Sequence, residues 1–279
     1  MKSLKTPLRY PGGKSRVAPM LVDKMPRITE YREPFLGGGS TAIEFTKRYR
    51  DIPVWVNDLY VPLYNFWTIL QEDPDTLSDA LMGLKMNHDT PEKARELYHS
   101  AKTRVNDPDI FLSAVYFWVM NKCSYSGLTE NSSFSPQASV QNFTKKGIKN
   151  LPYYGELIQD WKITNLDYKK CFGDDAFLFL DPPYDIKDFL YGKNREMHKS
   201  FDHNLFAENV YKCKHKFMIT YNVNIRLMQL YAQYELNFWN LRYSMVHRGD
   251  KGTEDNVKQE LLVTNYNIHP VTPIEQLLA

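Results

Sequence analysis

Residues 177–184 constrain the fold of this chain more than any other stretch, and they read FLFLDPPY. Four apolar residues in a row are typical of a strand buried on both faces, although a piece of buried helix has the same pattern. The two prolines favour the strand, because proline can neither continue a helix nor donate to a sheet ladder. We therefore expect the Asp181 carboxylate at the carboxyl edge of a strand, beside the Pro182 carbonyl and the Tyr184 ring.

This arrangement of acceptors predicts a ligand site. In open α/β sheets, ligands bind at the carboxyl edge of the strands. Two adjacent acceptors and a stacking surface suit a planar group that carries an NH2. Taken alone, an Asp-Pro-Pro sequence is also compatible with a simple turn that has a capping Asp.

The composition is that of a soluble globular protein: 279 residues, 43% hydrophobic and 24% charged. This length allows one large α/β domain or a core with an inserted second domain. The longest apolar stretch, residues 110–120, is about half of what a bilayer span needs. The first residues lack the apolar core of a signal peptide, so we expect a cytoplasmic protein, in a host cytoplasm if a phage encodes it.

The three cysteines, Cys123, Cys171 and Cys213, are odd in number and far apart, which fits neither a disulfide framework nor a zinc site. Positive charge is concentrated in two places. Residues 1–27 hold seven Lys or Arg and a single Asp, and Lys145, Lys146 and Lys149 form a second group. Such patches are typical of phosphate contact, but also of an ordinary solvated face.

Two glycine loops precede the helical part of the chain. Residues 9–16 read RYPGGKSR, and Leu8 stands where a P-loop has its first glycine, so we expect a basic loop that brings Lys14 to an anion rather than a triphosphate site. Residues 31–40 read YREPFLGGGS, which predicts a short strand into Glu33, a glycine loop and a helix over 41–49. Sites for NAD, FAD and S-adenosylmethionine all use such a turn.

An acidic residue is expected about 20 residues after the glycines, at the end of the next strand, to hold ribose hydroxyls. Asp58 lies 19 residues after Gly39, behind the apolar run 54–56. An N-cap or turn role is the alternative for Asp58.

The chain then changes character. Helical spacing is found at 62–71, 75–86, 91–105 and 109–122. We read about a hundred residues as a helical insertion between the second and third strands of a sheet. The polar segment 123–143 is either a surface excursion or a finger that carries amide and hydroxyl groups to base edges. Further strands are expected at 162–165, 177–181, 217–220, 234–241 and 259–265, a helix at 204–213, and polar loops at 185–203 and 247–253.

In this order, the motifs resemble those of the Dam-like (D12 class) DNA adenine-N6 methyltransferases. The shared pattern comprises the Tyr10–Lys14 loop, the Glu33–Gly39 loop, Asp58, a helical insert and Asp181–Tyr184. The resemblance implies a Rossmann-like α/β methyltransferase sheet, residues 1–61 and 162–279. It also implies a mostly helical DNA target-recognition domain, residues 62–161.

The resemblance also implies a cofactor, a substrate and their binding residues. The cofactor is S-adenosyl-L-methionine and the substrate is double-stranded DNA, with no metal, no membrane and, in restriction–modification, a companion restriction endonuclease. The implied cofactor residues are Tyr10, Lys14, Glu33, Phe35, Gly37, Gly39, Asp58, Asp167 and Asp181. The DNA residues are Arg9, Asn121, Ser126 and Leu128, to which we add Lys145 and Lys146 of the second basic group.

The chemistry follows from residues 181–184. A target adenine must leave the duplex, after which Tyr184 stacks on it while Asp181 and the Pro182 carbonyl accept hydrogen bonds from N6–H. These bonds direct the nitrogen lone pair at the methyl group, which is catalysis by positioning and electrostatics. No cysteine follows a proline, which argues against cytosine-C5 chemistry.

Several alternatives stay open. Methylation of RNA or of cytosine N4 could use the same acceptor pair, and a DNA-binding relative could keep the fold without the activity. A nicotinamide oxidoreductase is disfavoured because it leaves the double proline unexplained. Thr129-Glu130 stands where a GATC-reading relative has a basic residue, which argues against GATC as the target.

Overall fold

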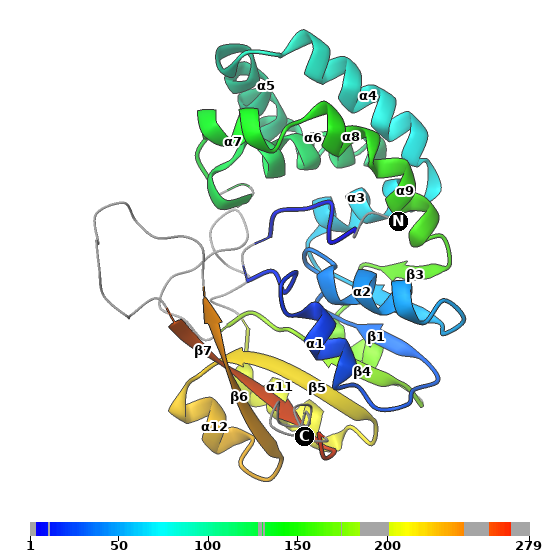
Figure 1. Ribbon diagram of the computed structural model, residues 1–279, viewed down its shortest axis with the longest axis vertical. Helices are drawn as coiled ribbons and strands as arrows, with labels where there is room; N and C mark the ends of the chain where they lie inside the picture. Colours follow the sequence, from blue (N-terminus) through cyan, green and yellow to red (C-terminus); the bar gives the residue numbers. More distant parts are fainter. Residues whose placement is uncertain are drawn as a thin grey trace, which may run out of the picture.

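The computed structural model describes residues 4–10, 12–127, 130, 132–173, 175–184, 201–242 and 257–268. These residues form a seven-stranded sheet that occupies the lower half of the molecule in Figure 1. Its strands are β1 (Tyr31–Glu33), β2 (Val54–Asn57), β3 (Trp161–Thr164), β4 (Phe177–Leu180), β5 (Lys216–Asn222), β6 (Glu235–Arg242) and β7 (Val257–Thr264). The order is β3-β2-β1-β4-β5-β7-β6. The first five strands run parallel, and β7 is antiparallel to both of its neighbours.

The apolar run of β4 is buried on both faces, as its sequence predicts. Phe177 and Phe179 point into one hydrophobic cluster, whereas Leu178 and Leu180 point into another on the opposite face. This alternation follows from the two-residue period of a strand. The sheet is therefore the middle layer of three.

Helices cover both faces of the sheet. Residues of α1 (Ala18–Asp23) and α2 (Ser40–Arg48) belong to the cluster of Phe177, and these two helices lie in front of the sheet in Figure 1. Residues of α11 (His203–Lys212) and α12 (Ile225–Leu230) belong to the cluster of Leu178. The side-chain oxygens of Asp202 and Asn224 accept from backbone amides of the first turns of α11 and α12 and so fix where these helices begin.

The chain between β2 and β3 forms the helical upper half of the molecule (Figure 1). Its helices are α3 (Val61–Glu72), α4 (Pro74–Asn87), α5 (Pro91–Arg104), α6 (Ile110–Cys123), α7 (Pro136–Gln141), α8 (Lys145–Lys149) and α9 (Leu151–Leu157). Most of them begin at the signals expected of helix starts: α3, α4, α5, α7 and α9 have proline in the first turn, and Asp109 caps α6.

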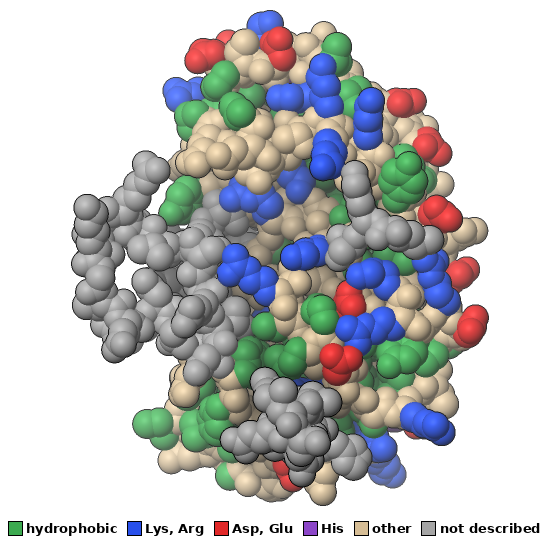
Figure 2. Space-filling model, viewed as in Figure 1, with side chains coloured by type: hydrophobic (Ala, Val, Ile, Leu, Met, Phe, Trp, Pro, Cys, Tyr) green, Lys and Arg blue, Asp and Glu red, His purple; other side chains and the backbone are tan. Residues whose placement is uncertain are grey.

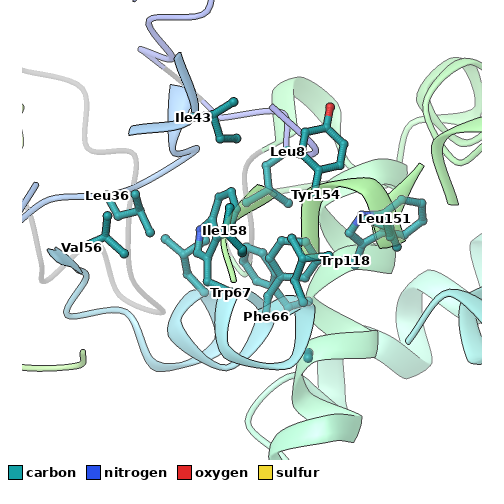
Figure 3. Close-up of a cluster of buried hydrophobic side chains, with 14 of the residues drawn as sticks. Leu8, Leu36, Ile43, Val56, Phe66, Trp67, Trp118, Leu151, Tyr154 and Ile158 are labelled. Atoms are coloured by element: carbon teal, nitrogen blue, oxygen red, sulfur yellow. The ribbon is translucent and has the colours of Figure 1, made fainter. Parts of the chain in front are cut away.

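The helical half and the sheet share one hydrophobic core. Figure 3 shows Leu36 and Val56 of the sheet half in the same cluster as Trp67, Trp118 and Ile158. The central helix, α6, is buried from Ser113 through Cys123, which explains why its sequence is apolar without a polar face. None of the described helices is long and apolar enough to cross a membrane.

The predicted helices and strands are confirmed to within a few residues of their ends, and the helical insertion between the second and third strands is confirmed. The segment 123–143 combines a bridge, a turn and a short helix among its described residues. Ser124 forms an isolated bridge with Phe134, a 3-10 turn covers Tyr125–Gly127, and α7 follows. The short helices α8, α9 and α12 carry too few apolar turns to be predicted from periodicity. The predicted loop 247–253, the tail from 270 and most of loop 185–203 lie outside the described residues.

Candidate active site

The candidate site lies where the direction of strand succession reverses. From β1 the chain proceeds outward through β2 and β3, and β4 then pairs with the other side of β1. Ligands of open α/β sheets bind in the crevice at this point, beyond the carboxyl ends of the strands. Glu33 is the last residue of β1, and Asp181 directly follows the last residue of β4.

The Asp181 carboxylate is held by three hydrogen bonds. Lys14 donates from Nζ to both carboxylate oxygens, at 2.9 and 3.0 Å, and Thr220 of β5 donates from Oγ1 to Oδ1 at 2.6 Å. The Lys14 side chain is 4% exposed and that of Asp181 is 22% exposed. The carboxylate is thus anchored within the fold and still open on one side.

Tyr184 belongs to the same network. Its hydroxyl accepts from Lys14 Nζ at 2.7 Å and donates to Glu260 Oε2 of β7 at 2.6 Å. Lys14 Nζ also lies 4.9 Å from the centre of the Tyr184 ring, within cation–π range. A nitrogen with N–H donors therefore lies beside both the Asp181 carboxylate and the aromatic ring.

Glu33 is a buried carboxyl close to this network. Tyr31 donates from its hydroxyl to Glu33 Oε2 at 2.6 Å, and the backbone amide of Ala42 also donates to the carboxyl. Burial, together with the negative charge of Asp181, raises the pKa of Glu33 to about 8, so the group is held largely neutral at pH 7. A cation placed between these two carboxyls would favour ionisation of Glu33.

The glycine loop after β1 is packed without room for side chains. Gly37 and Gly39 have positive φ, at 49° and 65°. A Cβ added at Gly37 would lie 2.9 Å from the Tyr10 ring, and one at Gly39 would lie 2.8 Å from Trp67. The loop is therefore fixed between an aromatic side chain of the N-terminal segment and one of α3.

Asp58 fixes the same loop from the end of β2. Its carboxylate accepts from the backbone amides of Gly37, at 2.8 Å, and Tyr60, at 3.0 Å. Burial of the carboxylate raises the pKa of Asp58 to about 6. The acidic residue selected by the spacing thus lies against the glycine loop, and its contact with the Tyr60 amide is that of a turn residue.

Asn57 joins three loops at this edge of the sheet. Its side-chain amide donates to the carbonyls of Pro34, at 3.1 Å, and Leu166, at 2.9 Å, while its Oδ1 accepts from the Leu166 amide and the Thr164 hydroxyl, each at 2.8 Å. Its side chain is buried. Sequence reasoning missed this residue, although an asparagine at the end of a buried strand was a signal that could have identified it.

Apolar surface is exposed at the ends of β2 and β3. Leu59 is 61% exposed and Leu166 is 41% exposed, and the Asn165 side chain donates to the Asp58 carbonyl between them, at 2.7 Å. Asp167, predicted to bind the cofactor, has a largely exposed side chain that caps the short helix after it. We refer to Leu59 and Leu166 as the apolar shelf.

Phe35 lies on the opposite side of the loop from Tyr10. Its ring packs against Tyr168, 5.4 Å between centroids, and against Phe206, 5.8 Å. The structure thus places Phe35 in an aromatic cluster that supports the loop, and Phe35 is only partly buried.

Asn121 lies in the interior of the protein, whereas a residue that contacts a DNA base is expected at the surface. It is fully buried, and its amide bonds to Arg9 N and O and to Gly127 O, so its polar groups face the N-terminal segment. Arg9 Nη1 donates to Ser124 O at 2.9 Å. The side chain of Ser126 and all of Leu128 lie outside the described residues. Complete burial excludes a direct DNA contact by Asn121 in this conformation.

Lys145 and Lys146 are exposed on α8. Figure 2 shows Lys and Arg side chains along one face of the molecule, from the helical half across to the sheet half.

Among the described residues, no group of three His, Cys, Asp or Glu side chains is arranged to hold a metal ion. The structure therefore brings together Lys14, Asp181 and Tyr184, and adds Thr220 and Glu260, which sequence reasoning did not place in the site.

The chain is similar to known proteins over most of its length. The model of a family described as D12 class N6 adenine-specific DNA methyltransferase matches residues 10–245. "Type II methyltransferase M.MjaIII" of Methanocaldococcus jannaschii is 24% identical over 93% of this chain and 98% of its own. "Type II methyltransferase M.CviBI" of Paramecium bursaria Chlorella virus NC1A is 22% identical over 94% of this chain and 100% of its own. A "DNA adenine methylase" of Vibrio cholerae is 24% identical over 66% of each chain.

Proposed function

Because the chain belongs to the D12 class of N6 adenine-specific DNA methyltransferases, we propose that it moves a methyl group from S-adenosyl-L-methionine to adenine N6 within a specific sequence of double-stranded DNA. One observation carries the proposal for the site itself. Lys14 Nζ, a nitrogen with N–H donors, lies 2.9 Å from Asp181 and 4.9 Å from the centre of the Tyr184 ring. The site therefore has the acceptors and the ring that an exocyclic amine requires.

Asp181 and the Pro182 carbonyl would each accept a hydrogen bond from the adenine amino group. Two such bonds draw the nitrogen lone pair out of conjugation with the ring and orient it. Two neighbouring side chains keep the acceptor and the ring in place for the adenine. The Thr220 hydroxyl fixes Asp181 Oδ1, and the Glu260 carboxylate fixes the Tyr184 hydroxyl. The ionised Asp181 also stabilises positive charge that develops on N6.

Lys14 must release Asp181 before an adenine can occupy this position, because its Nζ bonds both carboxylate oxygens. In the absence of DNA this contact keeps the buried ammonium and the carboxylate paired, which avoids an uncompensated charge. When the base enters, its N6–H groups replace the N–H groups of Lys14. The Tyr184 hydroxyl and the Gly12 carbonyl, at 2.7 and 3.0 Å from Nζ, remain as partners for Lys14.

The residues around the glycine loop fit S-adenosyl-L-methionine, which supplies a methyl group on a positively charged sulfur. Glu33 and Asp181 are acidic partners for a cation, Asp58 is the acceptor for ribose hydroxyls, and the apolar shelf (Leu59 and Leu166) offers a surface for a purine ring. The backbone amide of Gly37 donates a hydrogen bond to the Asp58 carboxylate. Ribose binding and the conformation of the glycine loop would therefore depend on the same carboxylate.

The helical half is proposed to read the DNA. Its face carries the exposed Lys145 and Lys146, and Figure 2 shows basic side chains continuing toward the sheet half. Backbone phosphates are contacted by such a surface, and the target base must flip out of the stack to reach Asp181. Two relatives are named Type II methyltransferases, which supports a role in restriction–modification with a companion endonuclease. Because the proposed substrate is DNA, we expect the protein to act in the cytoplasm.

The test is to incubate the protein with methyl-labelled S-adenosyl-L-methionine and either DNA or RNA, and then to identify the labelled nucleoside by mass spectrometry. We expect N6-methyl-2′-deoxyadenosine from DNA alone. Label in N4-methylcytosine, or only in RNA, would replace the proposal with one of the alternatives. If the protein binds DNA but no nucleoside carries label, it is a DNA-binding relative without activity.

A further inference from the structure

The N-terminal segment, of which residues 6–10 and 12–14 are described, contacts the end of α6 and both parts of the active site. We call this segment the strap. At its far end, Lys14 holds Asp181. In the middle, the Tyr10 ring covers the glycine loop, and Thr6 donates from Oγ1 to the Gly38 carbonyl. The strap therefore touches the loop proposed for the cofactor and the carboxylate proposed for the target base.

The last turn of α6 holds the near end of the strap. Asn121 accepts from Arg9 N at 3.0 Å and donates to Arg9 O at 2.6 Å, so one side chain pairs with both backbone groups of a strap residue. Lys122 donates from Nζ to the Pro7 carbonyl. Both side chains are buried. These contacts join positions 112 or more residues apart in the sequence.

The loop after α6 is in backbone contact with the same strap residue. Gly127 has φ of 73°, and a Cβ added there would lie 2.4 Å from Arg9 O. Asn121 Nδ2 also donates to Gly127 O at 3.2 Å. Gly127 therefore cannot move toward the strap without displacing Arg9, because no space separates the two backbones at this point.

We propose that Asn121 and Lys122 are positioning residues that couple the loop at 125–127 to the strap, so that DNA contact at this loop draws Lys14 away from Asp181. Neither residue touches the reacting atoms, and the inference rests on the proposed function. In the structure the strap holds Lys14 on Asp181, and the proposal requires a second arrangement in which Lys14 is released. Coupling of this kind is reciprocal, so DNA and cofactor should change each other's affinity.

The first test compares Asn121→Ala with Asn65→Ala. Asn65 is a matched control, because it too is a buried asparagine of the helical half, bonded to Ser113 at 3.0 Å and not to the strap. The affinity for S-adenosylhomocysteine is measured by calorimetry with and without a duplex that contains the sequence methylated in cells expressing the protein. For the wild type and Asn65→Ala we expect DNA to change this affinity by roughly 5- to 150-fold. For Asn121→Ala we expect the factor to fall toward one.

Turnover provides a second readout that a purely structural role would not change. With Asn121→Ala, kcat at saturating DNA should fall at least about tenfold relative to Asn65→Ala, while KM for DNA changes little. Equal kcat and equal coupling in the two variants would overturn the inference. So would a wild type in which DNA leaves the affinity for S-adenosylhomocysteine unchanged.

Lys122→Met tests the same link in a variant that should fold even if Asn121→Ala does not. Burial lowers the pKa of Lys122 to about 7, so its charged form is disfavoured in the folded protein, and Met keeps a similar apolar volume while it removes the donor to the Pro7 carbonyl. We expect a partial loss of coupling, and full coupling in this variant would contradict the role of Lys122.

The proposed function is judged separately: it fails if the wild type methylates no adenine, whatever the variants show.

Discussion

Replacement of Glu33 by Gln should remove a pH dependence of folding that this carboxyl imposes. Burial raises its pKa from 4.5 to about 8, so between these values the native state keeps a proton that the unfolded state releases. Stability falls with rising pH wherever the native state binds more protons. A shift from 4.5 to about 8, at about 1.4 kcal/mol per pH unit, corresponds to about 5 kcal/mol lost between pH 4.5 and pH 8.

The assay is denaturant unfolding of the wild type and of Glu33→Gln at pH 5, 6.5 and 8. The amide is neutral throughout and can still bond to the Tyr31 hydroxyl, so the difference in unfolding free energy should move in favour of the variant by several kcal/mol as pH rises. Glu44→Gln, at a carboxyl near the surface that is paired with Lys47 and Arg48, is the control and should show no such trend. A wild-type-to-variant difference that is constant from pH 5 to 8 would show that Glu33 does not keep a proton in the native state over this range.

Two further substitutions test the glycine loop. Gly39→Ala should destabilise the protein by about 2–5 kcal/mol, because the new Cβ meets Trp67 and the backbone is left-handed, whereas Gly83→Ala in open space should be neutral or stabilising in thermal unfolding. Equal melting temperatures for the two variants would show that the loop is not tightly packed. Asp58→Asn should weaken cofactor binding by calorimetry about 10-fold or more, and wild-type affinity should fall as pH drops through about 6, where Asp58 gains a proton. Unchanged affinity in the variant would remove Asp58 from the cofactor site.

The parts of the site that the sequence predicted are marked by short motifs in the chain itself. Two prolines after four apolar residues mark where Asp181 leaves its strand, and the strand is buried on both faces as expected. The spacing between the glycines and the next acidic residue selected Asp58 as a ribose ligand, and the structure places its carboxylate oxygen 2.8 Å from the Gly37 amide nitrogen, at the edge of the glycine loop. Signals of this kind depend on backbone chemistry over a few residues.

The parts that were missed depend on contacts between distant segments. Thr220 and Glu260 reach Asp181 and Tyr184 from β5 and β7, and nothing in their own neighbourhoods marks them. Asn121 was predicted to contact DNA because of its position in a motif, yet tertiary packing places it in the interior. The pairing of Arg9 with Asn121, 112 residues apart, has no counterpart in hydrophobic periodicity or turn chemistry.

The proposed mechanism depends on the Asp181 carboxylate, which accepts the hydrogen bond that activates the target amine. The most direct measurement is single-turnover methyl transfer to DNA by Asp181→Ala, with S-adenosyl-L-methionine binding measured in parallel. We expect that Asp181→Ala abolishes methyl transfer while the cofactor still binds, because the glycine loop and Asp58 remain intact. Methyl transfer at the wild-type rate by Asp181→Ala would show that this carboxylate does not activate the amine.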